Sequence, residues 1–147
     1  MALPVLYSLR NCPYAMRARM AVYKSGQIVA LRDLVLSNKP KEMIAASAKA
    51  TVPILVLSES KVIDESVDIM LWALSESDPN NMLRIDQCVQ HYNETERNIP
   101  QKFDEILSLI YLFDNEFKPS LEAYKCAKRY HEDNVQECRE VCETYID

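Results

Sequence analysis

A cysteine followed by proline, Cys12-Pro13, is the residue pair whose chemistry can be predicted most directly from this chain. Residues 4–7 form a short apolar run that predicts a strand, and proline suits the first position of a helix, where its missing N–H costs nothing. Cys12 is therefore expected at a helix N-cap, facing unpaired backbone N–H groups and the positive end of the helix dipole. These groups and the nearby cations Arg10 and Arg17 favour the thiolate, the reactive form of cysteine. A small buried cysteine is the alternative that this pair alone leaves open.

A proline also stands directly before the apolar run at residues 54–57, in the sequence Thr51-Val52-Pro53. Proline cannot donate to a strand ladder, and a tight entry into a strand is one of the few places where a cis X-Pro bond is found. If the Val52-Pro53 bond is cis, the backbone of Val52 turns outward and can pair with an extended peptide ligand. An ordinary trans turn is the alternative.

Charged and hydroxyl groups that suit the two ends of a peptide follow at Lys39 and at Asp64-Glu65-Ser66. Ser66 is expected to cap a helix, where its hydroxyl and the helix N–H groups bind a carboxylate, while Glu65 attracts an ammonium group. Lys39 supplies a charge for a second carboxylate. An ordinary helix start and an exposed loop lysine are the alternatives.

The elements that must position these residues alternate between strand and helix patterns. Strands are predicted at residues 4–7, 29–36, 54–57 and 61–63, and helices at residues 13–24, 40–48 and from 66 onward, in the order βαβαββα. Gly26, the single glycine, is placed to end the first helix. The crossover helix makes the first two strands parallel, and the hairpin at residues 58–60 makes the last two antiparallel. The apolar helix positions predicted to pack inward are Met16, Met20, Tyr23, Met43, Ile44, Val67, Met70, Leu71 and Leu74.

The rest of the chain shows only helical periodicity. A polar linker at residues 75–81 is followed by predicted helices at 82–97, 100–113, 116–130 and 134–145. The sequence therefore predicts an α/β domain with a mixed sheet at residues 1–78 and an all-α helical domain at 79–147.

Composition excludes several classes of function. The net charge of −5 divides into +1 over residues 1–78 and −6 over residues 79–147, which leaves no basic surface suited to nucleic acid. No apolar run approaches the ~20 residues that span a membrane, and no signal pattern opens the chain, so a cytoplasmic location is expected. The odd number of cysteines, five, points to a reducing compartment. Cys126, His131, Cys138 and Cys142 lack the spacing of a zinc site, so no metal is expected.

Four motifs in register resemble the glutathione transferase superfamily. They are the segment at residues 6–19 around Cys12-Pro13-Tyr14, then Asn38-Lys39-Pro40, Thr51-Val52-Pro53 and Val62-Ile63-Asp64-Glu65-Ser66. The similarity is strongest to the cysteine-type branches, which are the omega class and related bacterial transferases. The resemblance implies a thioredoxin-like N-terminal domain that binds glutathione as a substrate.

The same resemblance implies a role for each matched residue. Cys12 is the nucleophile that forms a mixed disulfide with glutathione, Tyr14 lines the same loop, and Val52, before a cis Pro53, pairs with the cysteinyl backbone. Glu65 and Ser66 hold the γ-glutamyl end, and Lys39 holds the glycine carboxylate. The implied activity is that of a glutathione-dependent thiol transferase acting on a disulfide or electrophilic small molecule.

Two features of the sequence depart from that pattern. Ala50 stands where related sequences often carry glycine, and the helical domain is shorter than in bacterial transferases, so it is expected to be incomplete. A shortened domain would leave apolar surface exposed, which either a homodimer or the helix predicted at residues 82–97 would cover. A homodimer is the expected state. The alternative function is a non-catalytic glutathione transferase-like binding or dimerisation module. Membrane insertion, as in chloride intracellular channel proteins, would need an apolar helix that the sequence lacks.

Overall fold

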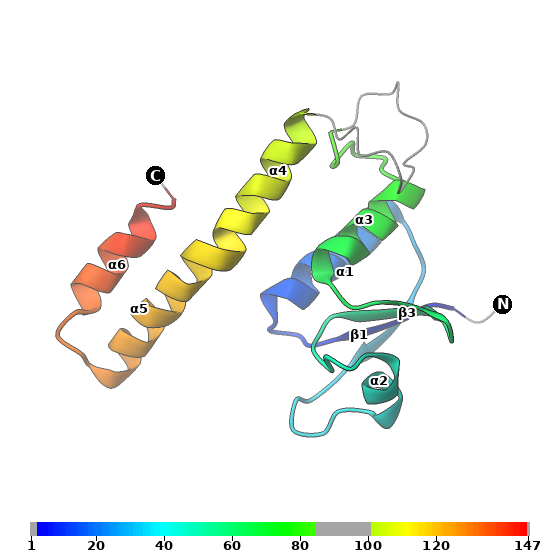
Figure 1. Cartoon of the computed structure of the whole chain (residues 1–147), viewed down its shortest axis with the longest axis horizontal. Helices are drawn as coiled ribbons and strands as arrows, with labels where there is room; N and C mark the ends of the chain where they lie inside the picture. Colours follow the sequence, from blue (N-terminus) through cyan, green and yellow to red (C-terminus); the bar gives the residue numbers. More distant parts are fainter. Residues whose placement is uncertain (1–2, 85–100, 147) are drawn as a thin grey trace. The chain divides into compact units, whose positions relative to one another are not determined.

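The computed structural model describes residues 3–84 and 101–146. The chain forms two compact units, Met1–Leu83 and Arg84–Asp147 (Figure 1). The predicted helix at residues 82–97 falls almost wholly outside the described residues. Its first two residues, Met82 and Leu83, belong to a turn.

The first unit contains the predicted βαβαββα order. Its elements are β1 (Val5–Ser8), α1 (Pro13–Ser25), β2 (Ala30–Asp33), α2 (Lys41–Ala46), β3 (Ile54–Ser58), β4 (Lys61–Ile63) and α3 (Ser66–Glu76). The predicted strand at residues 29–36 is shorter in the structure, because the chain turns after β2 and Val35 pairs with Asn38 in an isolated bridge. The mixed sheet and its helices form the predicted thioredoxin-like architecture.

The four strands lie in the order β2-β1-β3-β4. β1 pairs with β2 in parallel, whereas β1 with β3 and β3 with β4 are antiparallel. Helices α1 and α3 pack against each other on one face of this sheet, and α2 lies on the other face (Figure 1). Both the parallel crossover and the final hairpin are therefore as predicted.

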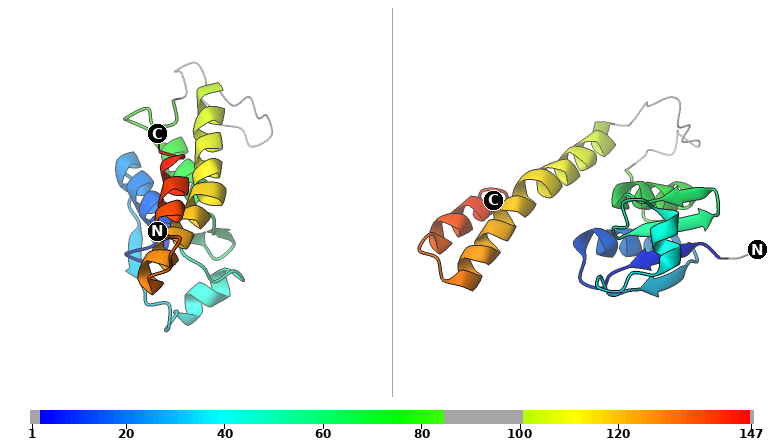
Figure 2. Two further views of the ribbon diagram at one scale, coloured as in Figure 1. Left: turned by 90° about the vertical axis from the view of Figure 1, so that its left-hand side faces the viewer. Right: turned by 60° about the horizontal axis from the view of Figure 1, so that its bottom comes forward.

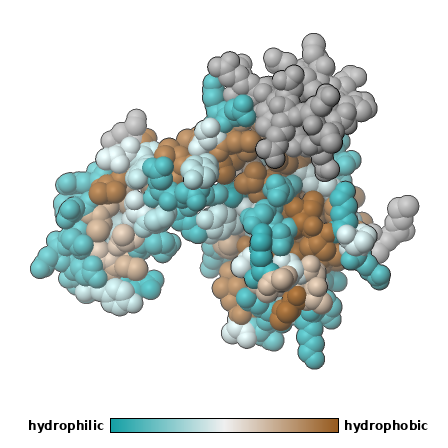
Figure 3. Space-filling model, viewed as in Figure 1, coloured by the Kyte–Doolittle hydropathy of each residue, from teal (hydrophilic) through white to brown (hydrophobic). Residues whose placement is uncertain are grey.

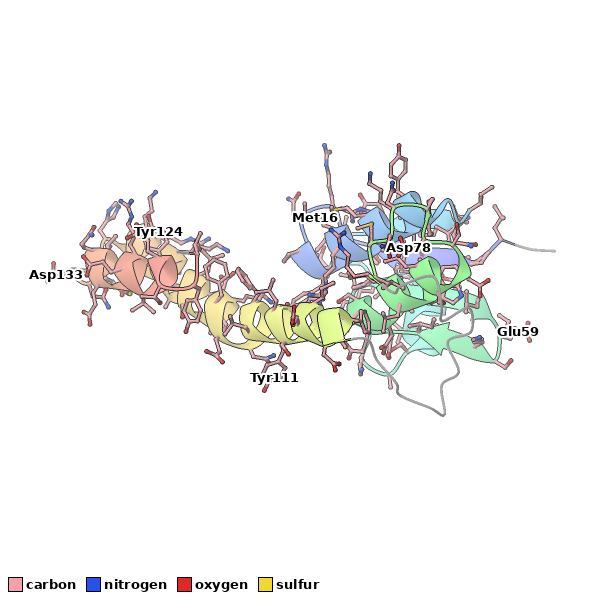
Figure 4. All side chains as sticks on the ribbon, turned by 90° about the horizontal axis from the view of Figure 1, so that it is seen from above. Met16, Glu59, Asp78, Tyr111, Tyr124 and Asp133 are labelled. Atoms are coloured by element: carbon pink, nitrogen blue, oxygen red, sulfur yellow. The ribbon has the colours of Figure 1, made fainter. Side chains whose placement is uncertain are left out.

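The buried face of α1 differs from the prediction. Met16, Met20 and Tyr23, expected to pack inward, are 45%, 60% and 81% exposed. Met16 is labelled on α1 in Figure 4. The buried positions of α1 are instead small or β-branched: Ala15, Ala18, Ala21, Val22 and Ser25. Because α1 packs closely against α3, small side chains suit that face, and the larger ones remain on the solvent side.

The inward faces of α2 and α3 were also predicted only in part. Met43 of α2 is fully buried in a cluster with Tyr7, Leu34 and Ile54, but Ile44 is 51% exposed. In α3, the fully buried residues are Ile69 and Ala73, with Leu74 nearly so. Val67, Met70 and Leu71 are only half-buried. α2 is six residues long, so its core contact needs only one large side chain.

Two local backbone features bound the elements that carry the site. Gly26 ends α1 with φ = 73°, a left-handed conformation that glycine adopts without steric cost. Ala50 adopts φ = 46° in the turn before β3, at the position where related sequences often carry glycine.

After α3, the Asp78 carboxylate accepts hydrogen bonds from the N–H groups of Met82 and Leu83, both 2.8 Å long, so the predicted linker ends in a folded turn.

The described part of the second unit is helical. Its elements are α4 (Gln101–Leu112), the π-helical turn η1 (Phe113–Phe117), α5 (Lys118–Tyr130) and α6 (Val135–Glu143). Two separate helices were predicted at 100–113 and 116–130, but η1 joins α4 to α5 in one continuous run, alongside which α6 returns (Figure 2). Pro119 lacks an N–H donor, and the wider π turn before it lets the helix continue past the proline.

Aromatic rings pack within η1 and between η1 and the segment that follows α6. The rings of Phe113 and Phe117 lie 5.0 Å apart, and Phe117 meets Tyr145 at 6.0 Å. Ala127 and Cys142 are buried where α5 and α6 pack together. Large apolar side chains also reach the surface of both units (Figure 3); Tyr111 of α4 is 66% exposed.

Candidate functional site

Cys12 occupies the predicted N-cap of α1, with Pro13 as the first helical residue. Its backbone carbonyl accepts the first helical hydrogen bond, from the Met16 N–H at 2.8 Å. No side-chain hydrogen bond from Cys12 caps the helix. The sulfur instead lies 3.9 Å from the carbonyl oxygen of Val52, within the range of a weak S–H···O contact. Cys12 as a whole residue is half-buried, in the segment between β1 and α1.

The Val52-Pro53 peptide bond is cis, as the sequence analysis expected. Pro53 is buried at the entry to β3, and Val52 is half-buried against the core on the α2 side of the sheet. The Val52 carbonyl oxygen is the atom that contacts the Cys12 sulfur, although the two residues are 40 positions apart in the chain.

Arg19 fixes the loop that carries Cys12. Its guanidinium donates hydrogen bonds to the Ser8 hydroxyl and to the carbonyls of Leu9 and Arg10, the last two at 3.1 Å. Ser8 is 1% exposed at the end of β1. One side chain of α1 thus fastens the strand end and the loop that precedes the cysteine.

Replacing Arg19 with alanine is expected to lower the free energy of unfolding by about 1.5–3 kcal/mol, because it removes charged hydrogen bonds and leaves buried Ser8 without this donor. Urea unfolding followed by circular dichroism measures the change. Arg32→Ala, which removes the same charge from an exposed position of β2, is the control and is expected to cost less than about 1 kcal/mol. Equal losses in the two variants would contradict this role of Arg19.

A second arginine of α1 links the starts of two helices. The Arg17 guanidinium donates two hydrogen bonds to the Ser66 hydroxyl oxygen, from Nε at 3.0 Å and from a terminal nitrogen at 2.8 Å. It also lies over the Tyr14 ring, 4.9 Å from the ring centroid. Ser66 is 4% exposed. Because its oxygen accepts both bonds, the Ser66 hydroxyl hydrogen is directed elsewhere and can be donated.

The predicted helix cap at Ser66 is wrong by one residue. Glu65 is the N-cap of α3, and Ser66 is the first helical residue. The Glu65 backbone carbonyl accepts a hydrogen bond from the Ile69 N–H at 3.0 Å, but the Glu65 side chain does not cap the helix. Ser66 can therefore be held by Arg17 while the Glu65 carboxylate points to other partners.

The Glu65 carboxylate forms an ion pair with Lys49, which also contacts the Asp64 carboxylate at 3.4 Å. Asp64 accepts a 2.6 Å hydrogen bond from the hydroxyl of Ser47, the residue that ends α2. This hydrogen bond, assisted by the Lys49 charge, lowers the pKa of Asp64. The two carboxylates raise the pKa of Lys49, Glu65 through its hydrogen bond being the larger cause. Both shifts favour the charged forms of Asp64 and Lys49.

Five of the predicted site residues fall into three groups. Cys12 and Val52 are in contact, Tyr14 and Ser66 share Arg17, and Glu65 is held by Lys49. Lys39 lies half-buried between the Val35–Asn38 bridge and the start of α2. Its predicted contact with a carboxylate stays a prediction.

Sequence reasoning named Arg17 only as a cation near Cys12, without its contacts to Ser66 and Tyr14, and it gave Arg19 and Lys49 no place in the site. The arginines lie at helical spacing after Cys12, so a search for donors one and two turns into α1 would have found them. Lys49 gives no such signal, since its partner lies 16 residues away and only the fold brings them together.

The structure gives two further results on function. Within residues 3–84 and 101–146, no three His, Cys, Asp or Glu side chains gather so that they could hold a metal ion. Over the same ranges, no helix combines the length and apolar character needed to span a bilayer.

The fold places the chain in the class of proteins that have a thioredoxin-like N-terminal domain followed by a helical region. The family model for the glutathione S-transferase N-terminal domain matches residues 6–81, which is about half of the chain. The chain therefore belongs to the glutathione S-transferase family. No curated protein matches the sequence.

Solved structures of glutathione transferases share this fold over nearly the whole chain. Glutathione transferase Omega 3C from Trametes versicolor has a TM-score of 0.76 at 17% identity, covering 99% of this chain and 57% of that one. Glutathione S-transferase unclassified 2 from Bombyx mori has a TM-score of 0.72 at 13% identity, with coverages of 99% and 64%. A homologue from Sulfitobacter with bound glutathione has a TM-score of 0.65 at 14% identity, with coverages of 98% and 67%. The chain thus spans about three-fifths to two-thirds of the length of these proteins.

Proposed function

We propose that this protein is a glutathione-dependent thiol transferase in which Cys12 acts as the single nucleophile. The observation that carries the proposal is the Cys12 sulfur at the N-cap of α1, 3.9 Å from the Val52 carbonyl. An extended cysteinyl peptide that pairs with the Val52 backbone would bring its own sulfur next to Cys12. The helix N-terminus favours negative charge on the attacking sulfur.

The reaction consists of two thiol–disulfide exchanges. The Cys12 thiolate attacks the glutathione sulfur of a mixed disulfide, the S–S bond breaks, and the substrate leaves as a thiolate that takes a proton from solvent. A second glutathione, as thiolate, then attacks the Cys12–glutathione disulfide, which releases oxidised glutathione and restores the Cys12 thiolate. Position 15 is alanine, so this site has no Cys-x-x-Cys partner and the exchange must use glutathione as the resolving thiol.

The two charged ends of glutathione match the remaining site residues. The Ser66 hydroxyl, held by Arg17, is suited to donate to the γ-glutamyl carboxylate, and Glu65 is suited to bind the neighbouring ammonium group. Tyr14, whose ring centroid lies 4.9 Å from the Arg17 guanidinium, is proposed to line the ligand. Lys39 receives the glycine carboxylate. The second substrate is a disulfide or an electrophilic small molecule.

Incubation of the chain with oxidised glutathione is expected to add one glutathione, and peptide mass spectrometry should locate it on Cys12. Cys126, which is exposed on α5, is the internal control, because an exposed thiol without a ligand site should react much more slowly. Equal modification of Cys12 and Cys126 would contradict the proposed site. Reversible glutathione binding without any adduct would instead support the alternative, a non-catalytic binding module.

The predicted homodimer and the cytoplasmic location belong to the same proposal and remain predictions. Sedimentation velocity of the purified chain tests the first of them.

A further inference from the structure

The carboxylate proposed to bind the ammonium group of glutathione already has an ammonium partner within the chain. Lys49 Nζ pairs with Glu65 Oε1, and the two side chains are 52% and 60% exposed. A ligand with an α-ammonium group must therefore compete with Lys49 for the same oxygen atoms. An exposed pair of this kind is weak enough to open, because water and salt screen it.

Lys49 has a second carboxylate within reach if it leaves Glu65. Asp64 Oδ1 lies 3.4 Å from Nζ, and the other oxygen of Asp64 is held by the buried Ser47 hydroxyl at 2.6 Å. Ser47 is 5% exposed, so this anion is fixed in place from the protein side. Lys49 can shift toward Asp64 without losing its charge partner, which reduces the cost of freeing Glu65.

We propose that Lys49 is a displaceable counter-ion of Glu65 and that it sets how strongly the site prefers ligands that carry an α-ammonium group. This proposal rests on the proposed function, since it concerns the same ligand end. With Lys49 in place, the ligand's ammonium group must displace Lys49 to reach Glu65, so a peptide that lacks the amino group loses less than it would opposite an unpaired Glu65. Without Lys49, the Glu65 charge is unpaired and favours ligands with an ammonium group.

The experiment compares two ligands, glutathione and its des-amino analogue glutaryl-cysteinyl-glycine, by isothermal titration calorimetry. Lys49→Ala is expected to bind glutathione about two- to fivefold more tightly than the unchanged protein, the range of one exposed ion pair. The same variant is expected to bind the analogue equally well or more weakly, because the analogue's carboxylate then faces an unpaired Glu65. The ratio of the two affinities should therefore rise.

Two further variants distinguish the effect of Lys49 on the affinity ratio from the effect of a change in net charge. Lys49→Arg keeps the positive charge and is expected to restore the ratio of the unchanged protein. Lys24→Ala removes the same charge from the last turn of α1, at the opposite end of that helix from Cys12, and is expected to leave the ratio unchanged.

Each outcome has a definite consequence. An unchanged ratio in Lys49→Ala, with glutathione still bound by all variants, overturns the role of Lys49 and leaves the proposed function standing. An equal shift in Lys24→Ala overturns it as well, since net charge alone would explain the result. If the unchanged protein binds neither ligand, the proposed function and this inference both fall.

Discussion

Replacing Cys12 with serine is expected to lower glutathione-coupled disulfide reduction by about a hundredfold or more. A serine hydroxyl is not ionised near neutral pH, and its oxygen cannot form the mixed disulfide on which the exchange depends. Glutathione binding should change little, because the groups proposed to hold its two ends are left intact. The measurement pairs a coupled assay of oxidised glutathione formation with calorimetric binding, both on the Cys12→Ser variant.

The matched control is Cys126→Ser, which removes an exposed thiol from α5 and should leave the rate unaltered. Retained activity in Cys12→Ser would shift the chemistry to a hydroxyl that activates glutathione for conjugation. Ser8 and Tyr14 carry hydroxyl groups close to Cys12 in the sequence. Ser8 is 1% exposed and already accepts a hydrogen bond from Arg19, so Tyr14 would be the residue to replace next.

The sequence predicted the order and pairing of the strands because local signals determine them. The apolar run after Pro53, the hairpin turn at residues 58–60 and the single glycine after α1 each mark a boundary without help from distant residues. The N-cap position of Cys12 follows from the same kind of signal, the proline at the next position.

The buried faces of the helices were harder to predict from periodicity alone. On α1 the stripe of large residues, Met16, Met20 and Tyr23, gave the stronger apolar pattern, yet alanines occupy the core face. Hydrophobic periodicity weights large side chains, whereas close helix packing favours small ones. The choice between these faces depends on α3, which lies some forty residues later in the chain.

The electrostatic contacts of the site also join residues that are far apart in the sequence, so they too could not be predicted from local patterns. Arg17 and Ser66 are 49 residues apart, and Lys49 and Glu65 are 16 apart, so neither pair leaves a pattern in the sequence. The four motifs predict which residues face a ligand, but they do not reveal the side chains of this chain that contact those residues. Arg17 donates two hydrogen bonds to the Ser66 oxygen and so leaves the Ser66 hydroxyl hydrogen to be donated. Lys49 forms an ion pair with the Glu65 carboxylate.

Replacing Glu65 with glutamine is expected to weaken glutathione binding by about 1.5–3 kcal/mol, roughly ten- to a hundredfold in Kd. Glutamine keeps the size of the side chain but removes the charge that is proposed to pair with the ligand's ammonium group. Calorimetry of Glu65→Gln against the unchanged protein measures the loss. Asp68→Asn is the control, because it removes an acidic charge from the first turn of the same helix and should change Kd by less than about twofold.

A double variant connects this result to the ion pair. In the Glu65→Gln background, Lys49→Ala should no longer tighten glutathione binding, since the carboxylate that Lys49 competes for is gone. Unchanged affinity in Glu65→Gln alone would place the ammonium group elsewhere. Tightening by Lys49→Ala in both backgrounds would mean that Lys49 acts on the ligand directly and not through Glu65.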